Sequence, residues 1–208
     1  MFLSRLELDP GHPRARRDLG DPYEMHRTLA RAFAPDPDTP PPRFLWRLEP
    51  TPVTQPSAVL LIQAETAANW GPIESLGGYA REIRGNKPLD LSHLVRPDGR
   101  YRFRLRANPT VTRDGKRHGL DREEEQLTWL SRQGEKWGFA LRGCVRSASE
   151  RIQSRQGTTG RRITLRAVLF EGALEATDAD RMRAAVQNGL GHGKAWGLGL
   201  LSLARIAT

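Results

Sequence analysis

The sequence has little cysteine and no long apolar run. Cys144 stands alone among 208 residues, which excludes a disulfide framework and a metal site built on cysteine and is typical of a reducing compartment. Arg5 and Glu7 interrupt the apolar residues at the N-terminus, which argues against a signal peptide. We therefore expect a soluble, cytoplasmic protein with no membrane partner.

Lysine is also scarce. It accounts for four of the 33 basic residues, and the other 29 are arginine, in a chain with a formal net charge of +9. A GC-rich genome produces the same bias without functional meaning. Arginine, however, makes planar, bidentate contacts to phosphate that lysine cannot make. A polyanionic partner is therefore the first expectation.

Glycine is concentrated near the C-terminus, where "GLGHGKAWGLG" covers residues 189–199. A Walker A loop is excluded because it needs glycine at Asn188 and serine or threonine at Ala195. A dinucleotide fingerprint is excluded because Lys194 stands where a glycine is required. Two interpretations of this loop remain. It is either a glycine-rich turn that leads into a last strand, or a segment whose backbone passes close to a functional site. The loop glycines are Gly189, Gly191, Gly193, Gly197 and Gly199.

Hydrophobic periodicity and turn signals predict an α+β protein. In the first half we expect a strand at 1–9, a helix at 21–33, strands at 44–50 and 57–65, a weak helix at 73–76 within a loop-rich stretch 66–99, and a strand at 100–109. In the second half we expect a helix at 121–133, extended runs at 137–155 and 161–176, a helix at 178–189 and a strand at 198–206. Each half follows the order of a ferredoxin-like (RRM-like) domain. The prediction is two such domains in tandem, at 1–108 and 121–208, joined by a linker at 109–120, with a basic β-hairpin in the second domain.

The helix that follows Asp21 carries the first candidate site. At about 100° per residue, Tyr23, His26 and Arg27 share one face, and Arg31 flanks it. A phenol, an imidazole and guanidinium groups therefore meet within two turns, and such groups move protons and stabilise charge on a phosphate. The alternative is the solvated polar face of an ordinary amphipathic helix.

Two basic surfaces are candidates for binding a phosphate backbone. In "RYRFRLR" the alternation of a strand puts Arg102, Arg104 and Arg106 on one side of a sheet, with a solvated sheet face as the alternative. The second surface is the hairpin around "QGTTG", whose two arms carry four arginines. Like charges repel across paired strands, so an anionic ligand against this hairpin is the better explanation. Its arginines are Arg151, Arg155, Arg161 and Arg162.

Several segments together resemble the CasE family, the CRISPR RNA endoribonucleases of type I-E systems. These segments are "DPYEMHR" after a first strand, "FLWRLEP", "YRFRLRANP", "AVLFEG" and the closing "GLGHGKAWGLGLLSL". They run in the family's order from "MFLSRLEL" to "GLGLLSLA", nearly the whole chain. Several motifs in order are far more specific than any one of them.

The resemblance implies two tandem ferredoxin-like domains and a metal-independent cut in CRISPR repeat RNA, just 3′ of the stem-loop. The RNA's own 2′-hydroxyl would attack, leaving a 2′,3′-cyclic phosphate (or 3′-phosphate) and a 5′-hydroxyl. No cofactor and no metal are expected. The protein would then stay on the guide RNA and join the other subunits of the Cascade complex.

Residue by residue, the resemblance implies that Tyr23 and His26 are catalytic. Relatives often have lysine near position 31, where this chain has Arg31; arginine stabilises a phosphorane but should not shuttle protons. The basic hairpin would enter the groove of the RNA stem, and the glycine loop would pack near the catalytic helix. The residues expected to bind RNA are Arg27, Arg102, Arg104, Arg106, Arg151, Arg155, Arg161, Arg162 and Lys194.

Two other functions remain open at this point. A non-catalytic guide-RNA-binding subunit of the same superfamily would keep the basic surfaces without a working His26. A metal-dependent nuclease would need converging acidic residues, whereas Glu123, Glu124 and Glu125 are typical of a solvated helix start. Cleavage in EDTA separates these functions. The other histidines are expected to be solvated loop residues; they are His12, His93, His118 and His192.

Overall fold

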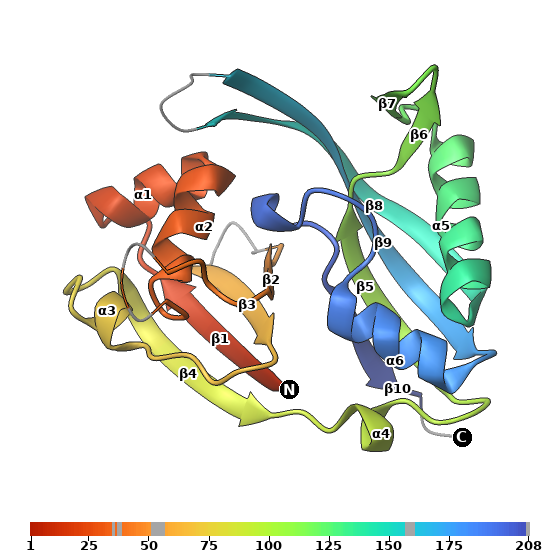
Figure 1. Ribbon diagram of the computed structural model, residues 1–208, viewed down its shortest axis with the longest axis horizontal. Coiled ribbons are helices and arrows are strands. Elements are labelled where there is room, and N and C mark those ends of the chain that lie inside the picture. Colours follow the sequence, from red (N-terminus) through yellow and green to blue (C-terminus); the bar gives the residue numbers. More distant parts are fainter. Residues whose placement is uncertain (35, 37–38, 51–56, 157–160, 207–208) are drawn as a thin grey trace. The chain divides into compact units, whose positions relative to one another are not determined.

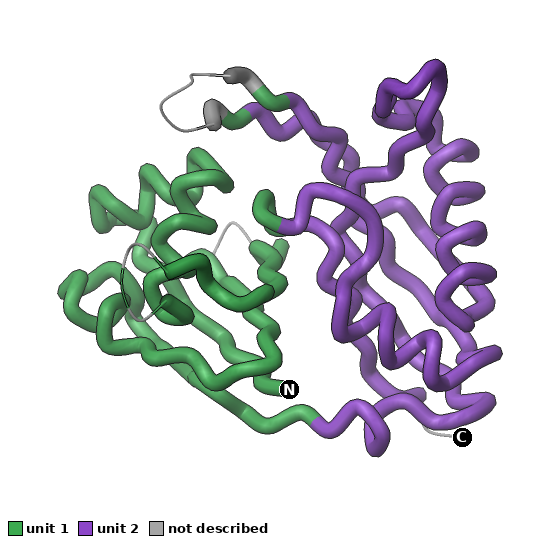
Figure 2. The backbone as a smooth tube through the Cα atoms, in the orientation of Figure 1, with its two compact units in different colours: residues 1–89, 154–163, 195–197 green, residues 90–153, 164–194, 198–208 purple. Residues whose placement is uncertain are grey.

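The computed structural model describes residues 1–34, 36, 39–50, 57–156 and 161–206. It divides into two compact units (Figure 2). The first unit consists of Met1–Leu89, Ser154–Ile163 and Ala195–Gly197, and the second of Asp90–Gln153, Thr164–Lys194 and Leu198–Thr208. Two short segments from late in the chain therefore belong to the N-terminal unit.

The first unit contains a four-stranded sheet with the strand order β2-β3-β1-β4 (Figure 1). Strand β1 pairs antiparallel with both β3 and β4. Two helices connect β1 to β2, and a short helix connects β3 to β4, which is the ferredoxin-like arrangement. The elements are β1 (Phe2–Leu8), α1 (Pro13–Gly20), α2 (Pro22–Ala30), β2 (Phe44–Leu48), β3 (Ala58–Ala64), α3 (Gly71–Glu74) and β4 (Ala80–Pro88).

The second unit repeats this topology with the strand order β10-β5-β9-β8. One helix connects β5 to β8, and another connects β9 to β10 (Figure 1). The elements are α4 (Leu91–Leu94), β5 (Arg100–Ala107), β6 (Thr110–Arg113), β7 (Lys116–Gly119), α5 (Glu123–Trp137), β8 (Phe139–Gln156), β9 (Arg161–Ala176), α6 (Ala179–Asn188), the 3₁₀ helix η1 (Lys194–Trp196) and β10 (Leu201–Arg205). The predicted α+β class with two ferredoxin-like halves is confirmed.

The structure divides the two halves differently from the predicted boundary. The sequence predicts that the strand at 100–109 closes a first domain that ends at 108, but β5 pairs with β9 and β10 in the second sheet. Strand β4, in the stretch expected to be loop-rich, completes the first sheet instead. The expected linker at 109–120 contains the antiparallel β6–β7 hairpin, within the second unit. β4 was missed because "AREIRGNKP" has no clean apolar alternation, so its strand character comes from pairing with β1.

Each unit has its own apolar core. In β1, Leu6 and Leu8 are fully buried and pack with Met25 and Leu29 of α2. In the second unit the strictly alternating β5 buries Tyr101, Phe103 and Leu105 against β9 and the helices. Each such side chain contributes about 1.5–3 kcal/mol when it is fully buried. Among the described residues no helix is both long and apolar enough to cross a membrane.

Candidate functional site

Helix α2 begins where the sequence predicts. Asp21 is the N-cap, and its side-chain oxygen Oδ1 accepts a hydrogen bond from the backbone N–H of Tyr23 at 2.9 Å, with Pro22 at the first helical position. Met25 and Leu29 are buried in the core, so they fix the rotation of the helix. Tyr23 and His26 are therefore half-buried on another face, and Arg27 on the same face is exposed.

The imidazole of His26 lies against an aromatic stack. Its ring centroid is 4.7 Å from that of Phe44 in β2, at an interplanar angle of 16°. Phe44 also stacks with Phe33, again at 4.7 Å. Burial lowers the pKa of His26, so the ring is neutral near pH 7. Nδ1 is buried and has no hydrogen-bond partner within the described part of the chain. A neutral imidazole has one nitrogen that can accept a proton.

Guanidinium groups lie along the same helix. The Arg27 guanidinium is 5.9 Å from the centroid of the Tyr23 ring, and it also pairs with Glu24 at 3.0 Å. Arg31 is exposed at the C-cap of the helix. The structure thus brings Tyr23, His26 and Arg27 onto one helix face and places Arg31 at its end. A phenol, a neutral imidazole and positive charge can together move protons and stabilise an anion.

A buried polar cluster that the sequence does not predict contacts this helix at Met25. Asp18, which is 1% exposed, accepts a hydrogen bond from the Tyr79 hydroxyl at 2.9 Å and pairs with Arg17 at 2.6 Å. The same hydroxyl lies 3.6 Å from the sulfur of Met25. Burial and the neighbouring Asp18 charge raise the pKa of Tyr79, so its proton stays in the hydrogen bond. Pro13 at the start of α1 was the available local signal for the helix that carries Asp18.

The glycine loop reaches the first unit at Gly197. This residue has φ +73°, and a Cβ atom there would lie 2.8 Å from the buried ring of Trp46 in β2. Trp46 is two residues after Phe44, the stacking partner of His26, so both point to the same side of the strand. The glycine at 197 is therefore needed for close packing against the strand that positions His26.

Lys194, in the same loop, is one of the residues expected to bind RNA. Its Nζ donates a hydrogen bond to the carbonyl of Gly191 at 2.8 Å.

We expect Gly197→Ala to destabilise the protein by about 2–4 kcal/mol, because alanine is strained at this φ and its methyl group overpacks Trp46. The midpoint of urea unfolding measures this loss. Gly20→Ala is the matched control, since a Cβ there meets nothing within 4 Å, and its effect should stay below about 1 kcal/mol. A Gly197→Ala protein that unfolds at the wild-type urea concentration would contradict the packing argument.

The arginines of β5 form a surface of mixed charge rather than a basic stripe. Arg104 pairs with Glu171 at 2.6 Å, and Arg106 pairs with Glu150 at 2.6 Å. Arg102 is exposed on the same side of the sheet. Glutamates from β8 and β9 thus offset the charge expected to attract phosphate, and this favours the solvated sheet face that was the alternative.

The hairpin of β8 and β9 is the second expected RNA-binding surface. The Arg151 side chain is 65% exposed, with Asp121 3.8 Å away, so it is available to an anion. Arg155, Arg161 and Arg162 lie in the two strands, but their side chains are outside the described residues. The end of the hairpin, Ser154–Ile163, belongs to the unit that holds α2, so the candidate catalytic helix and this end of the hairpin form one compact unit.

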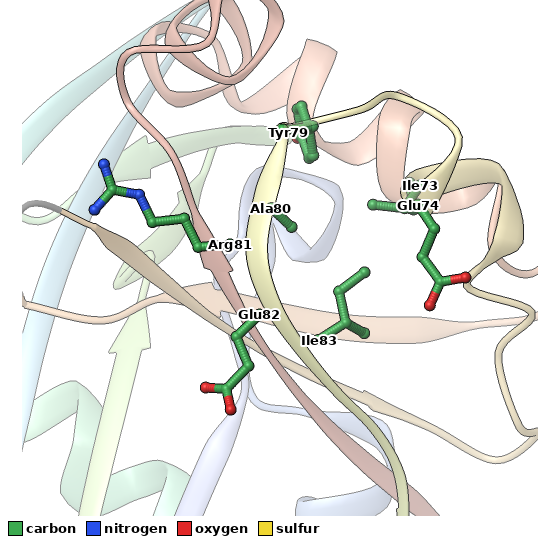
Figure 3. A pocket seen from close by; sticks show the side chains of 8 residues that line it. Ile73, Glu74, Tyr79, Ala80, Arg81, Glu82 and Ile83 are labelled. Carbon is green, nitrogen blue, oxygen red and sulfur yellow. The ribbon is translucent and has the colours of Figure 1, made fainter.

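The structure also contains a cavity that none of the expected site residues line. A cavity of about 270 Å³ over α3 and β4 is lined by Ile73, Glu74, Tyr79 and Arg81 among others, and by none of the expected site residues (Figure 3). In the described ranges, no group of three or more His, Cys, Asp and Glu residues is placed to hold a metal ion.

The remaining histidines differ in their surroundings. His93, His118 and His192 are exposed, although His118 lies in strand β7 and His93 in helix α4. His12 is not the solvated loop residue expected: it stands at the N-cap position of α1 without a side-chain capping hydrogen bond, and its ring meets Tyr79 edge-on with the centroids 5.9 Å apart. Its role is therefore structural, beside the Asp18 cluster.

This chain is similar to known CRISPR-associated proteins. A family model described as "CRISPR associated protein" matches residues 1–205. The chain is 39% identical to the CRISPR-associated endoribonuclease Cse3 of Thermus thermophilus over 216 residues, which cover 98% of this chain and 100% of that one. It is 31% identical to the CRISPR system Cascade subunit CasE of Escherichia coli, covering 98% and 99% of the two chains. A structure of the endoribonuclease Cse3 bound to a 19-nucleotide RNA superposes with a TM-score of 0.86, at 39% identity, and covers 98% of this chain and 100% of that chain.

Proposed function

This chain belongs to the family of CRISPR-associated proteins, and from that premise we propose that it is an endoribonuclease that cuts CRISPR repeat RNA just 3′ of the repeat's stem-loop. The observation that carries the proposal is the 39% identity, over 98% of the chain, to a protein named as a CRISPR-associated endoribonuclease. The half-buried Tyr23 and His26 on helix α2 supply groups that suit this reaction. The guide RNA stays bound, and the complex joins Cascade, of which the relative CasE is a named subunit.

The proposed reaction uses a nucleophile that the RNA supplies. The 2′-hydroxyl next to the scissile phosphate loses its proton and attacks phosphorus, the bond from phosphorus to the 5′ oxygen breaks, and that oxygen takes up a proton. The products are a 2′,3′-cyclic phosphate and a 5′-hydroxyl. The protein must align the hydroxyl, move the two protons and stabilise the added negative charge. His26 and Tyr23 move protons, and Arg31 contributes charge only.

The hairpin of β8 and β9 holds the RNA stem in this proposal. Arg151, Arg155, Arg161 and Arg162 bring positive charge to a double-stranded backbone, and the end of the hairpin belongs to the unit that carries α2. The major groove of an A-form helix is deep and narrow, so side chains cannot enter it along a long duplex. At the end of a short stem the groove is open, and there the hairpin would enter it. Reversing the charge of Arg161 and Arg162 should therefore weaken stem binding.

The test is cleavage of a labelled CRISPR repeat from the host genome in EDTA. We expect one cut, 3′ of the stem, and an upstream product lighter by one water than the linear 3′-phosphate, as measured by mass spectrometry. Cleavage that stops in EDTA would identify a metal-dependent nuclease. Binding without any cut would identify a guide-RNA-binding subunit without chemistry.

A further inference from the structure

The N-cap of α2 is shared between the helix and the distant β8–β9 hairpin. Oxygen Oδ1 of Asp21 accepts one hydrogen bond from the Tyr23 N–H at 2.9 Å and a second from the hydroxyl of Ser154 at 2.7 Å. Ser154 is only 5% exposed and lies 133 residues further along the chain. One carboxylate oxygen thus joins the first turn of the candidate catalytic helix to the arm of the basic hairpin.

The side chains of β8 alternate between exposed and buried positions, which explains how one strand can both offer arginine to RNA and bond to Asp21. Arg151 and Gln153 are exposed, whereas Ile152 and Ser154 are buried. Successive side chains of a strand point to opposite faces, so the strand presents arginine to solvent on one side and the serine hydroxyl to Asp21 on the other. A ligand seated on the exposed side would therefore contact the same strand whose serine hydroxyl holds the Asp21 carboxylate.

We infer that Ser154 is a positioning residue that couples the seating of RNA on the hairpin to the alignment of Tyr23. This inference rests on the proposed function. Ser154 touches no reacting atom; it acts through Asp21, whose carboxylate fixes the backbone of the turn that carries Tyr23. Asp21 still caps the helix when the serine hydroxyl is removed, so the helix forms but its first turn is held less firmly to the hairpin.

The first test separates the rate of cleavage from binding. Ser154→Ala should slow single-turnover cleavage at saturating protein by about 5–20-fold, since small misalignments of reacting groups cost rate steeply. Its Kd for a stem-loop made uncleavable by a 2′-deoxy substitution should stay within about twofold of wild type. Ser154→Thr keeps the hydroxyl and should restore the rate to within about threefold. Ser147→Ala is the matched control, because it removes a hydroxyl of the same strand that bonds to Glu171 instead of α2.

A wild-type cleavage rate in Ser154→Ala, or a loss confined to Kd, would overturn the inference. The melting temperature checks folding and should fall by no more than about 4 °C, the loss expected for one hydrogen bond in a chain of this length.

The second test does not depend on cleavage. RNA should slow amide hydrogen exchange in the first turn of α2 in the wild type, and Ser154→Ala should lose that slowing while it still binds RNA. If the wild type binds the repeat without cutting it, the proposed function is wrong, but the exchange experiment still decides the coupling. Equal slowing by RNA in wild type and Ser154→Ala would refute it.

Discussion

A single 2′-deoxy substitution at the nucleotide 5′ of the cut should abolish cleavage while the RNA binds with unchanged affinity. The attacking hydroxyl belongs to the substrate, so its removal leaves the aligned site without a nucleophile. An intramolecular nucleophile is worth an effective molarity of about 10⁵–10⁸ M, so we expect a loss of at least about 10⁴-fold in the single-turnover rate. Gel-resolved cleavage of end-labelled RNA measures the rate, and filter binding measures the affinity.

The matched control is the same 2′-deoxy substitution one nucleotide 3′ of the cut, which should change the rate by no more than about threefold. A cut in the substituted RNA would mean that water or a metal-bound hydroxide is the nucleophile. Such a reaction leaves a different terminus, so analysis of the product ends would reveal it. DNA of the same sequence should not be cut for the same reason as the substituted RNA.

The sequence predicts best those features that local chemistry decides. Asp21 and Pro22 mark the start of α2, and the spacing of apolar residues predicts which face Met25 and Leu29 bury. Neighbouring residues alone therefore predict that Tyr23 and His26 share a face, and in the structure both are half-buried residues of α2.

Features that depend on distant pairing could not be predicted from local patterns. Strand β4 contains Gly85 and Asn86, which has φ 56°, and pairs with β1, so no local signal identifies it as a strand. The register between β5 and β9 places Arg104 opposite Glu171, and this pairing neutralises a residue that looks free in the sequence. The contact between Ser154 and Asp21 likewise exists only because the end of the hairpin folds into the first unit.

His26→Ala should lower the single-turnover rate of cleavage at saturating protein by about 10²–10⁴-fold, the usual contribution of general acid–base catalysis. Binding of the uncleavable stem-loop should be unaffected, since the ring is half-buried against Phe44 and carries no charge near pH 7. Single-turnover kinetics with excess protein measure the effect. His93→Ala is the control, because His93 is an exposed histidine of α4 outside the candidate site.

A second variant separates chemistry from packing. His26→Phe keeps an aromatic ring to stack on Phe44, so the fold around β2 is preserved, but it has no nitrogen to carry a proton. We expect it to cleave as slowly as His26→Ala. If His26→Phe cleaved at the wild-type rate, His26 would be a packing residue and the polar face of α2 an ordinary helix surface.

The pH dependence of kcat/KM, measured as the second-order rate constant of single-turnover cleavage at subsaturating protein, reports the groups of the free protein and so assigns the direction of proton transfer. Burial lowers the pKa of His26 below its ordinary value of about 6.5, so the neutral form, which accepts a proton, dominates at and above neutral pH. We expect His26 to take the 2′-hydroxyl proton, so kcat/KM should be flat near pH 7 and fall only as the pH drops through the lowered pKa. A proton donor requires the charged form, and kcat/KM would instead fall as the pH rises through that pKa. This fall of kcat/KM at low pH should be missing in His26→Phe, because the group that titrates there is gone. If the fall persisted in His26→Phe, it would belong to another residue.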